Sequence, residues 1–121
     1  MSDLPNGKAL AKCYYIDENN KYSLNQRICK IKVKDDSIIN SKYLFYLLNR
    51  NSYYLRFDDG VNQTNLKKDD ILSLNLVLPS IKDQERDSKT LTIIDNFIEK
   101  ENNKLSKLFL LKKGLMQSMF V

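Results

Sequence analysis

The sequence predicts an α+β fold, with a small mixed sheet and a short helix followed by a long C-terminal coiled-coil helix. Before Pro79 the apolar residues mostly recur with the period of two that is typical of strands, and after Pro79 they recur with a helical period. With 121 residues the chain has room for one compact domain and hardly for two. We therefore divide it into an α+β domain at residues 1–80 and a long helix at residues 81–121.

Three segments of the first part predict strands. Residues 8–16 are rich in alanine and tyrosine, and residues 27–34 alternate apolar residues with three lysines. Residues 72–78 place a leucine at every second position until Pro79, which cannot donate to a sheet ladder, ends the strand.

A short helix is expected to begin around Ser41 and to end by residues 49–51. Its apolar side is formed by Tyr43, Leu44, Leu47 and Leu48. Residues 53–57 fit either a continuation of this helix or a short edge strand.

The long helix begins after Ser80, a favourable N-cap, with Asp83 three residues later in the manner of a capping box. A heptad repeat follows, in which seven of nine core positions are apolar. One core position is held by Leu91, Ile98, Leu105, Lys112 and Met119, and the other by Ile94, Glu101, Leu108 and Leu115. Such a helix is about 55 Å long, so residues 1–80 are too few to cover it and a partner helix is expected. A helix folded entirely onto its own domain is the alternative.

The composition excludes most kinds of active site. Histidine is absent, which removes Ser-His-Asp and Cys-His nucleophile systems and histidine metal sites. Three glycines are too few for a phosphate-binding loop, and we interpret Cys13 and Cys29 as small buried hydrophobic residues. We therefore expect no catalytic residue, no metal and no cofactor; a small enzyme subunit with an unrecognised active site is the alternative.

The charge is mildly basic and unevenly distributed. The net charge is +5, and residues 102–121 carry four lysines and no acid, whereas residues 81–101 carry four basic and six acidic side chains. This excess of positive charge is compatible with nucleic-acid binding. The chain has neither a secretory signal at its start nor an apolar run long enough to span a membrane, so we expect a cytoplasmic protein.

Two segments carry a resemblance to a known family. The first is GVNQTNL at residues 60–66, and the second is LVLPSIKDQE at residues 76–85. In this order they resemble the specificity (S) subunits of type I restriction–modification systems, in which a Gly-x-x-Gln-x-x-Leu-like loop precedes Leu-Pro-Pro-Leu-x-Glu-Gln at the start of a long helix. Here Ser80 replaces the second proline, and Asp83-Gln84 stands for Glu-Gln. The closing stretch at residues 108–120 is similar to the end of that helix.

The resemblance covers nearly the whole chain, but only the later part of one target-recognition domain and one conserved helix of the family. It implies a truncated S subunit that binds double-stranded DNA, docks methyltransferase and restriction subunits, and leaves the chemistry to them. The alternative is a coiled-coil interaction module that has lost DNA binding and pairs only with itself or with an intact S subunit.

Short amides, tyrosines and basic side chains are the candidate DNA contacts, because amides pair with base edges and lysines with phosphates. These residues are Lys8, Lys12, Tyr14, Asn25, Gln26, Arg27, Asn62, Gln63, Thr64, Asn65, Lys67 and Lys68. The structural alternative is that the amides close turns and the tyrosines line the core.

A homodimer is expected through the apolar face of the long helix. The pairing residues are Leu91, Ile94, Ile98, Leu105, Leu108, Leu115 and Met119. Glu101 and Lys112 interrupt this face, and such polar core residues either fix the register or lie at a wet, frayed interface. The acidic early helix and its basic end favour antiparallel over parallel pairing.

Overall fold

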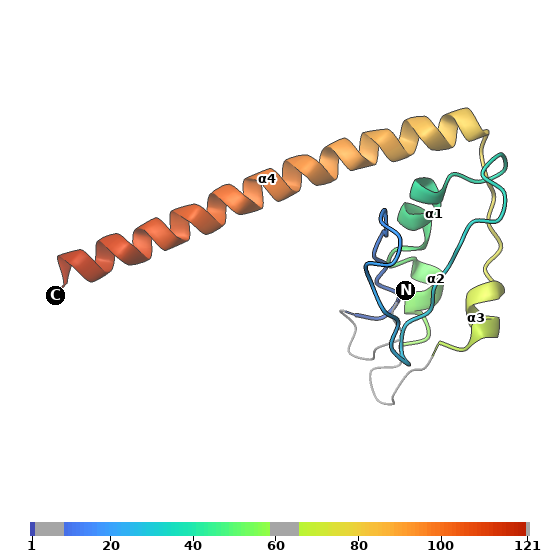
Figure 1. The fold of residues 1–121 in the computed structure, drawn as a ribbon, viewed down its shortest axis with the longest axis horizontal. Helices are drawn as coiled ribbons and strands as arrows, with labels where there is room; N and C mark the ends of the chain where they lie inside the picture. Colours follow the sequence, from blue (N-terminus) through green and yellow to red (C-terminus); the bar gives the residue numbers. More distant parts are fainter. Residues whose placement is uncertain (2–8, 59–65, 121) are drawn as a thin grey trace. The chain divides into compact units, whose positions relative to one another are not determined.

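A computed structural model describes residues 1, 9–58 and 66–120 of the chain (Figure 1). It divides into two units, Met1–Ser88 and Lys89–Val121. Its helices are α1 (Ser41–Leu48), α2 (Ser52–Leu55), α3 (Lys68–Leu72) and α4 (Ile81–Met119).

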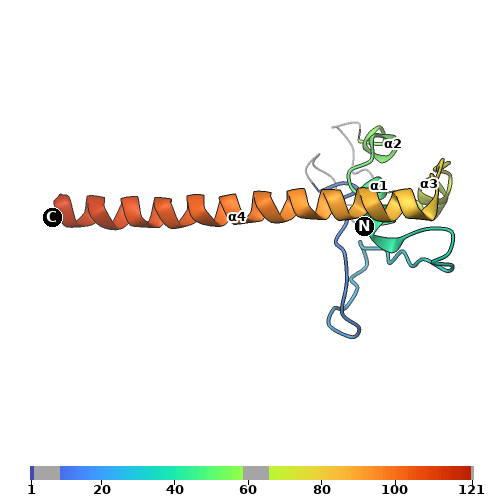
Figure 2. The ribbon, with the colours of Figure 1, turned by 90° about the horizontal axis from the view of Figure 1, so that it is seen from above.

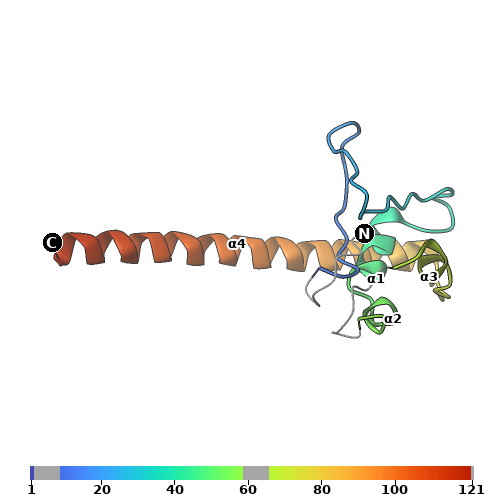
Figure 3. The same cartoon turned by 90° about the horizontal axis from the view of Figure 1, so that it is seen from below.

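The predicted mixed sheet is wrong for the part of the chain that the structure describes. No strand is present there, and Ile28 makes one isolated bridge. The chain between the helices is extended or turning, and it is drawn as a tube without arrows in Figures 1 and 3. The α+β fold class is therefore replaced by a helical one with long irregular connections.

The first predicted strand, at residues 8–16, is interrupted by a turn. Ala11 adopts a left-handed backbone conformation with φ of 55°, and the Lys12 N–H donates to the Ala9 carbonyl at 3.1 Å. After the turn, the Cys13 N–H donates to the side chain Oδ1 of Asn49 at 3.0 Å, where a strand would need a backbone acceptor.

The second predicted strand, at residues 27–34, is extended but pairs at one point. The N-terminal ammonium group of Met1 donates to the Cys29 carbonyl at 3.0 Å, and the Cys29 N–H donates to the Met1 carbonyl at 3.1 Å. The alternation survives only in part in the burial, since Cys29 and Val33 are half-buried and the three lysines are exposed, but Ile31 between them is also exposed.

The third predicted strand, at residues 72–78, begins in helix α3 and continues as extended chain from residue 74. Leu74, Leu76 and Leu78 are half-buried, whereas Val77 is 94% exposed. The period of two therefore indicates an extended backbone with one side more buried than the other, and among the described residues no second strand lies beside it.

The predicted short helix is confirmed as α1, and the ambiguous residues 53–57 lie largely in helix α2. Each helix starts at an asparagine whose side chain accepts a backbone N–H: Asn40 from Tyr43, and Asn51 from Tyr53, both at 2.9 Å. These caps satisfy helix N–H groups that have no intrahelical partner.

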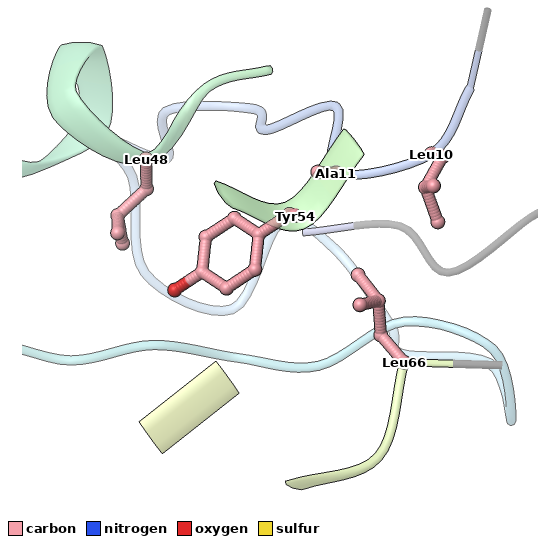
Figure 4. Close-up of a cluster of buried hydrophobic side chains, with 5 residues drawn as sticks. All are labelled: Leu10, Ala11, Leu48, Tyr54 and Leu66. Atoms are coloured by element: carbon pink, nitrogen blue, oxygen red, sulfur yellow. The ribbon is translucent and has the colours of Figure 1, made fainter. Parts of the chain in front are cut away.

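The core of the first unit is small, and Tyr54 lies at its centre (Figure 4). Leu10 and Ala11 come from the turn before Cys13, Leu48 from α1, Tyr54 from α2 and Leu66 from the chain entering α3. The Tyr54 hydroxyl donates to the backbone carbonyl of Ile71 at 3.0 Å, so its polar end is satisfied while its ring is buried.

Helix α4 is confirmed as one continuous helix of 39 residues (Figure 2). The Asp83 N–H donates to Ser80 Oγ, and the Ser80 hydroxyl donates to the Asp83 carboxylate at 2.7 Å, so the predicted cap is present. Within the first unit, Gln84 and Ser88 are buried. From residue 93 to residue 120, every residue is exposed.

Candidate DNA interface and helix-pairing surface

Lys12 and Tyr14 lie on the segment that follows the turn at Ala11. Both are exposed, and Tyr14 is 71% accessible. The Tyr14 and Tyr22 rings meet edge-on with their centres 5.6 Å apart. Their hydroxyl oxygens are 3.3 Å apart and form a hydrogen bond, which raises the pKa of Tyr22. The pair is part of neither the buried core nor a helix, so the core interpretation of Tyr14 does not apply.

Asn25, Gln26 and Arg27 form an exposed turn. The Asn25 side chain accepts the Arg27 backbone N–H at 3.0 Å, and its carbonyl accepts the Ile28 N–H at 3.3 Å. Asn25 therefore acts as a turn-forming residue here.

Lys67 and Lys68 lie at the start of α3, and both are exposed. The Lys67 N–H donates to the Asp70 carboxylate at 2.8 Å, which fixes the backbone at this end of the helix. Gln26 and Arg27 share a shallow hollow of about 130 Å³ with Leu66 and Ile71. The structure therefore brings the turn at residues 25–27 close to the segment that carries these two lysines.

Five of the predicted DNA contacts cannot be placed. Lys8, Asn62, Gln63, Thr64 and Asn65 lie outside the residues that the structure describes.

Two cation–aromatic clusters add basic side chains that the candidate set did not include. Lys42 Nζ lies 4.1 Å from the Tyr15 ring centre and 5.5 Å from that of Phe45. The Arg56 guanidinium lies 3.9 Å from the Tyr53 ring centre and is exposed. The spacing Tyr-x-x-Arg at residues 53–56 brings these two side chains to one side of a helical turn, which is the signal for such a contact.

Gln84 is a polar residue whose burial sequence reasoning missed. It is fully buried, and its side chain makes three hydrogen bonds. Its Oε1 accepts the Asn40 N–H at 2.9 Å, and its Nε2 donates to the carbonyls of Ile38 and Pro79 at 3.1 and 2.9 Å. The start of α4 is therefore joined to the chain segment that caps α1.

The predicted helix-pairing residues form an exposed apolar face on α4. All seven are between 39% and 72% exposed, from Leu91 to Met119. Phe97, Phe109 and Met116 widen the same face. Its opposite side carries Asn96, Lys100, Asn103 and Lys107, which are polar and spaced at helical intervals.

No metal-ligating group of side chains is found among the described residues. Cys13 and Cys29 are free, and burial raises the pKa of the Cys13 thiol. A thiol with a raised pKa is a poor nucleophile at neutral pH, because little thiolate is present.

The described part of the chain thus comprises a capped long helix with an exposed apolar face and a small helical unit with exposed lysines. Residues 10–109 match the type I restriction modification DNA specificity domain, and the chain belongs to that family. Specificity domains of this family are non-catalytic, so the expectation that the chain is not an enzyme is confirmed by the family to which it belongs.

A curated relative supports the same assignment. The chain is 30% identical over 86 residues to a protein of Methanocaldococcus jannaschii named as the MjaX type I restriction enzyme specificity subunit. The match covers 68% of this chain and 20% of that protein, so the chain spans about a fifth of its length. No solved structure matches the chain. None of the described helices is long and apolar enough to cross a membrane.

Proposed function

We propose that this chain is a DNA-binding specificity subunit of a type I restriction–modification system, acting in the cytoplasm. Unit Met1–Ser88 contacts double-stranded DNA, and unit Lys89–Val121 is the assembly helix. The match over residues 10–109 carries the proposal. Methyltransferase and restriction subunits of the same system are the partners that supply the chemistry.

The exposed cations of the first unit support the DNA contact. Lys12, Lys67 and Lys68 are exposed, and Tyr14 offers an accessible ring. The net charge of residues 1–88 is only +2, from 14 basic and 12 acidic side chains. DNA binding therefore depends on where these cations lie and less on the total charge.

The exposed apolar face of α4 supports self-association. Monomeric proteins rarely leave a continuous apolar patch of this kind in water, because burying it is favourable by roughly 25 cal/mol for each Å². A homodimer through Leu105, Leu108 and the other pairing residues covers this face.

The test of DNA binding is fluorescence anisotropy with labelled random-sequence duplexes between about 50 and 200 mM salt. The wild-type chain should bind and lose affinity steeply with salt. The double variant Lys67→Gln/Lys68→Gln should bind more weakly and lower the salt slope by about 2, one for each phosphate contact.

Lys21→Gln is the matched control, because Lys21 is exposed and already paired with Glu18 at 2.9 Å. It should leave the affinity for DNA unchanged. A wild-type chain that binds no duplex at 50 mM salt would leave the pairing helix as its only activity and would remove the DNA-binding part of the proposal. Co-purification with the methyltransferase subunit tests docking separately.

A further inference from the structure

The two charged residues in the heptad core of α4 select one way of pairing two copies. Glu101 and Lys112 occupy core positions in a face that is otherwise apolar. Glu101 is ion-paired with Lys104 of its own helix at 2.7 Å, and both side chains are more than half exposed. Burying either charge against an apolar side chain is costly, so a stable dimer must place each of them opposite a compensating charge.

One antiparallel register satisfies both charges at once. If Leu105 lies opposite Leu108 of the second copy, then Glu101 lies opposite Lys112 of that copy, and Lys112 opposite its Glu101. The same register sets Ile98 opposite Leu115. Every core position from residue 94 to residue 119 then meets a core position of the other class, as antiparallel coiled coils require.

The extent of the exposed helix fits this register. Residue 93 lies opposite residue 120 of the second copy, so the overlap covers the 28 residues from 93 to 120 that are all exposed. The overlap ends before Ser88, the last residue of the first unit.

Neighbouring registers are disfavoured. A shift of one heptad in one direction sets Lys112 against Ile94, and a shift in the other direction sets it against Leu108. In either shifted register, Glu101 and Lys112 of both copies are buried against apolar side chains, with no opposite charge facing them. A parallel pair sets Glu101 against Glu101 and Lys112 against Lys112, and it also aligns the basic ends of the helices.

We propose that the partner of the apolar face of α4 is a second copy of this chain, antiparallel, in the register fixed by two Glu101–Lys112 pairs. The inference rests on the self-association in the proposed function and on the antiparallel orientation that the charge distribution of the helix favours, and it adds the register. It assigns to Glu101 and Lys112 a role as specificity-determining residues of assembly.

Charge reversal of the full-length chain tests the pairing, with the dimer dissociation constant measured by analytical ultracentrifugation. Glu101→Lys alone and Lys112→Glu alone should each raise this constant by about tenfold or more, because like charges then meet at two places. The double variant Glu101→Lys/Lys112→Glu should return to within about threefold of the wild type, since both pairs are restored with opposite sign.

A matched control is Lys107→Glu, which reverses a charge on the polar side of α4 and should leave the dissociation constant nearly unchanged. In a parallel dimer the single and double core variants would all resemble the wild type, and that pattern would overturn the proposal.

Disulfide trapping tests the register independently, in a background with Cys13→Ala and Cys29→Ala. Ile98→Cys and Leu115→Cys are both at exposed positions, so neither should disturb the first unit. An oxidised mixture of the two variants should form a cross-linked heterodimer, whereas each variant alone should stay uncross-linked. Cross-linking of either variant with itself would overturn the antiparallel register.

These outcomes separate the two proposals. A wild-type chain that is monomeric at all concentrations removes the self-association and the register together. A dimer that ignores the charge reversals and fails to trap the Ile98–Leu115 pair removes the register and leaves the self-association standing.

Discussion

Among single side chains, Gln84 makes the most specific contribution to the fold. Its carboxamide uses both its acceptor and its two donor hydrogens on the backbone of residues 38, 40 and 79. Neither glutamate nor leucine can replace it, because glutamate lacks the donors and leucine lacks all three bonds.

Gln84→Ala should lower the free energy of unfolding of the first unit by about 2–3 kcal/mol, because three backbone groups lose their partner in a buried position. The loss can be measured by urea denaturation followed through the near-ultraviolet tyrosine signal, since all seven tyrosines lie between residues 14 and 54. Gln117→Ala, at an exposed position of the same helix, should change the stability by less than about 0.5 kcal/mol. Equal effects of the two variants would show that the buried bonds contribute nothing.

Cys13 should react slowly with thiol reagents in the folded chain. Its pKa is raised by burial, so at pH 8 it holds less thiolate than a cysteine in an unfolded chain. The raised pKa also means that folding favours the protonated thiol, and the stability that it contributes is lost as the pH rises through the folded pKa. The rate of labelling by a disulfide reagent in a Cys29→Ala background, with and without urea, measures the effect. Equal rates in the two conditions would contradict it.

Sequence reasoning found Gln84 as part of a motif but not as a buried residue. Glutamine is mostly exposed in proteins, so its burial could be inferred only from the position of Ser88 and Leu91 on the same side of the helix. Tyr54 illustrates the opposite case, because nothing local distinguishes it from Tyr53 and the core around it is assembled from distant segments.

Among the elements, the helices could be predicted and the sheet could not. Helices α1 and α4 carry their own signals, with a cap and a 3.6-residue period contained in the segment itself. A strand, however, is completed by another strand, and the alternation at residues 72–78 specifies only an extended backbone with two unlike sides.

Gly114→Ala should stabilise α4 by about 1 kcal/mol, because alanine favours helix and glycine does not. Gly114 lies inside the helix, and a methyl group added there would meet no atom within 4 Å. Thermal unfolding followed by far-ultraviolet circular dichroism should show a higher midpoint. Lys107→Ala, which exchanges two good helix formers, is the control and should shift the midpoint little; a lower midpoint for Gly114→Ala would mean that the glycine is needed for a close contact.

For the whole molecule, stability should depend on protein concentration. Dissociation of a dimer is favoured by dilution, so the melting midpoint of the far-ultraviolet signal should rise as the concentration is raised from about 1 to 100 μM. The variant Leu105→Asn/Leu108→Asn should remove this dependence while leaving the near-ultraviolet tyrosine transition of the first unit in place. A midpoint independent of concentration for the wild type would contradict self-association.

Helix α4 extends over both units of the chain. Its backbone amide hydrogens are therefore protected from exchange with solvent in two different ways. At its start, Gln84 and Ser88 are buried, so exchange with solvent deuterium there requires opening of the first unit. From residue 93 to residue 120 every residue is exposed, so the backbone there is shielded by its own helical turns and, in the proposed dimer, by the second copy. Exchange rates should therefore form a gradient along this single helix, and in the proposed dimer the residue at which they begin to change with dilution would mark where packing within one chain ends and contact with the second copy begins.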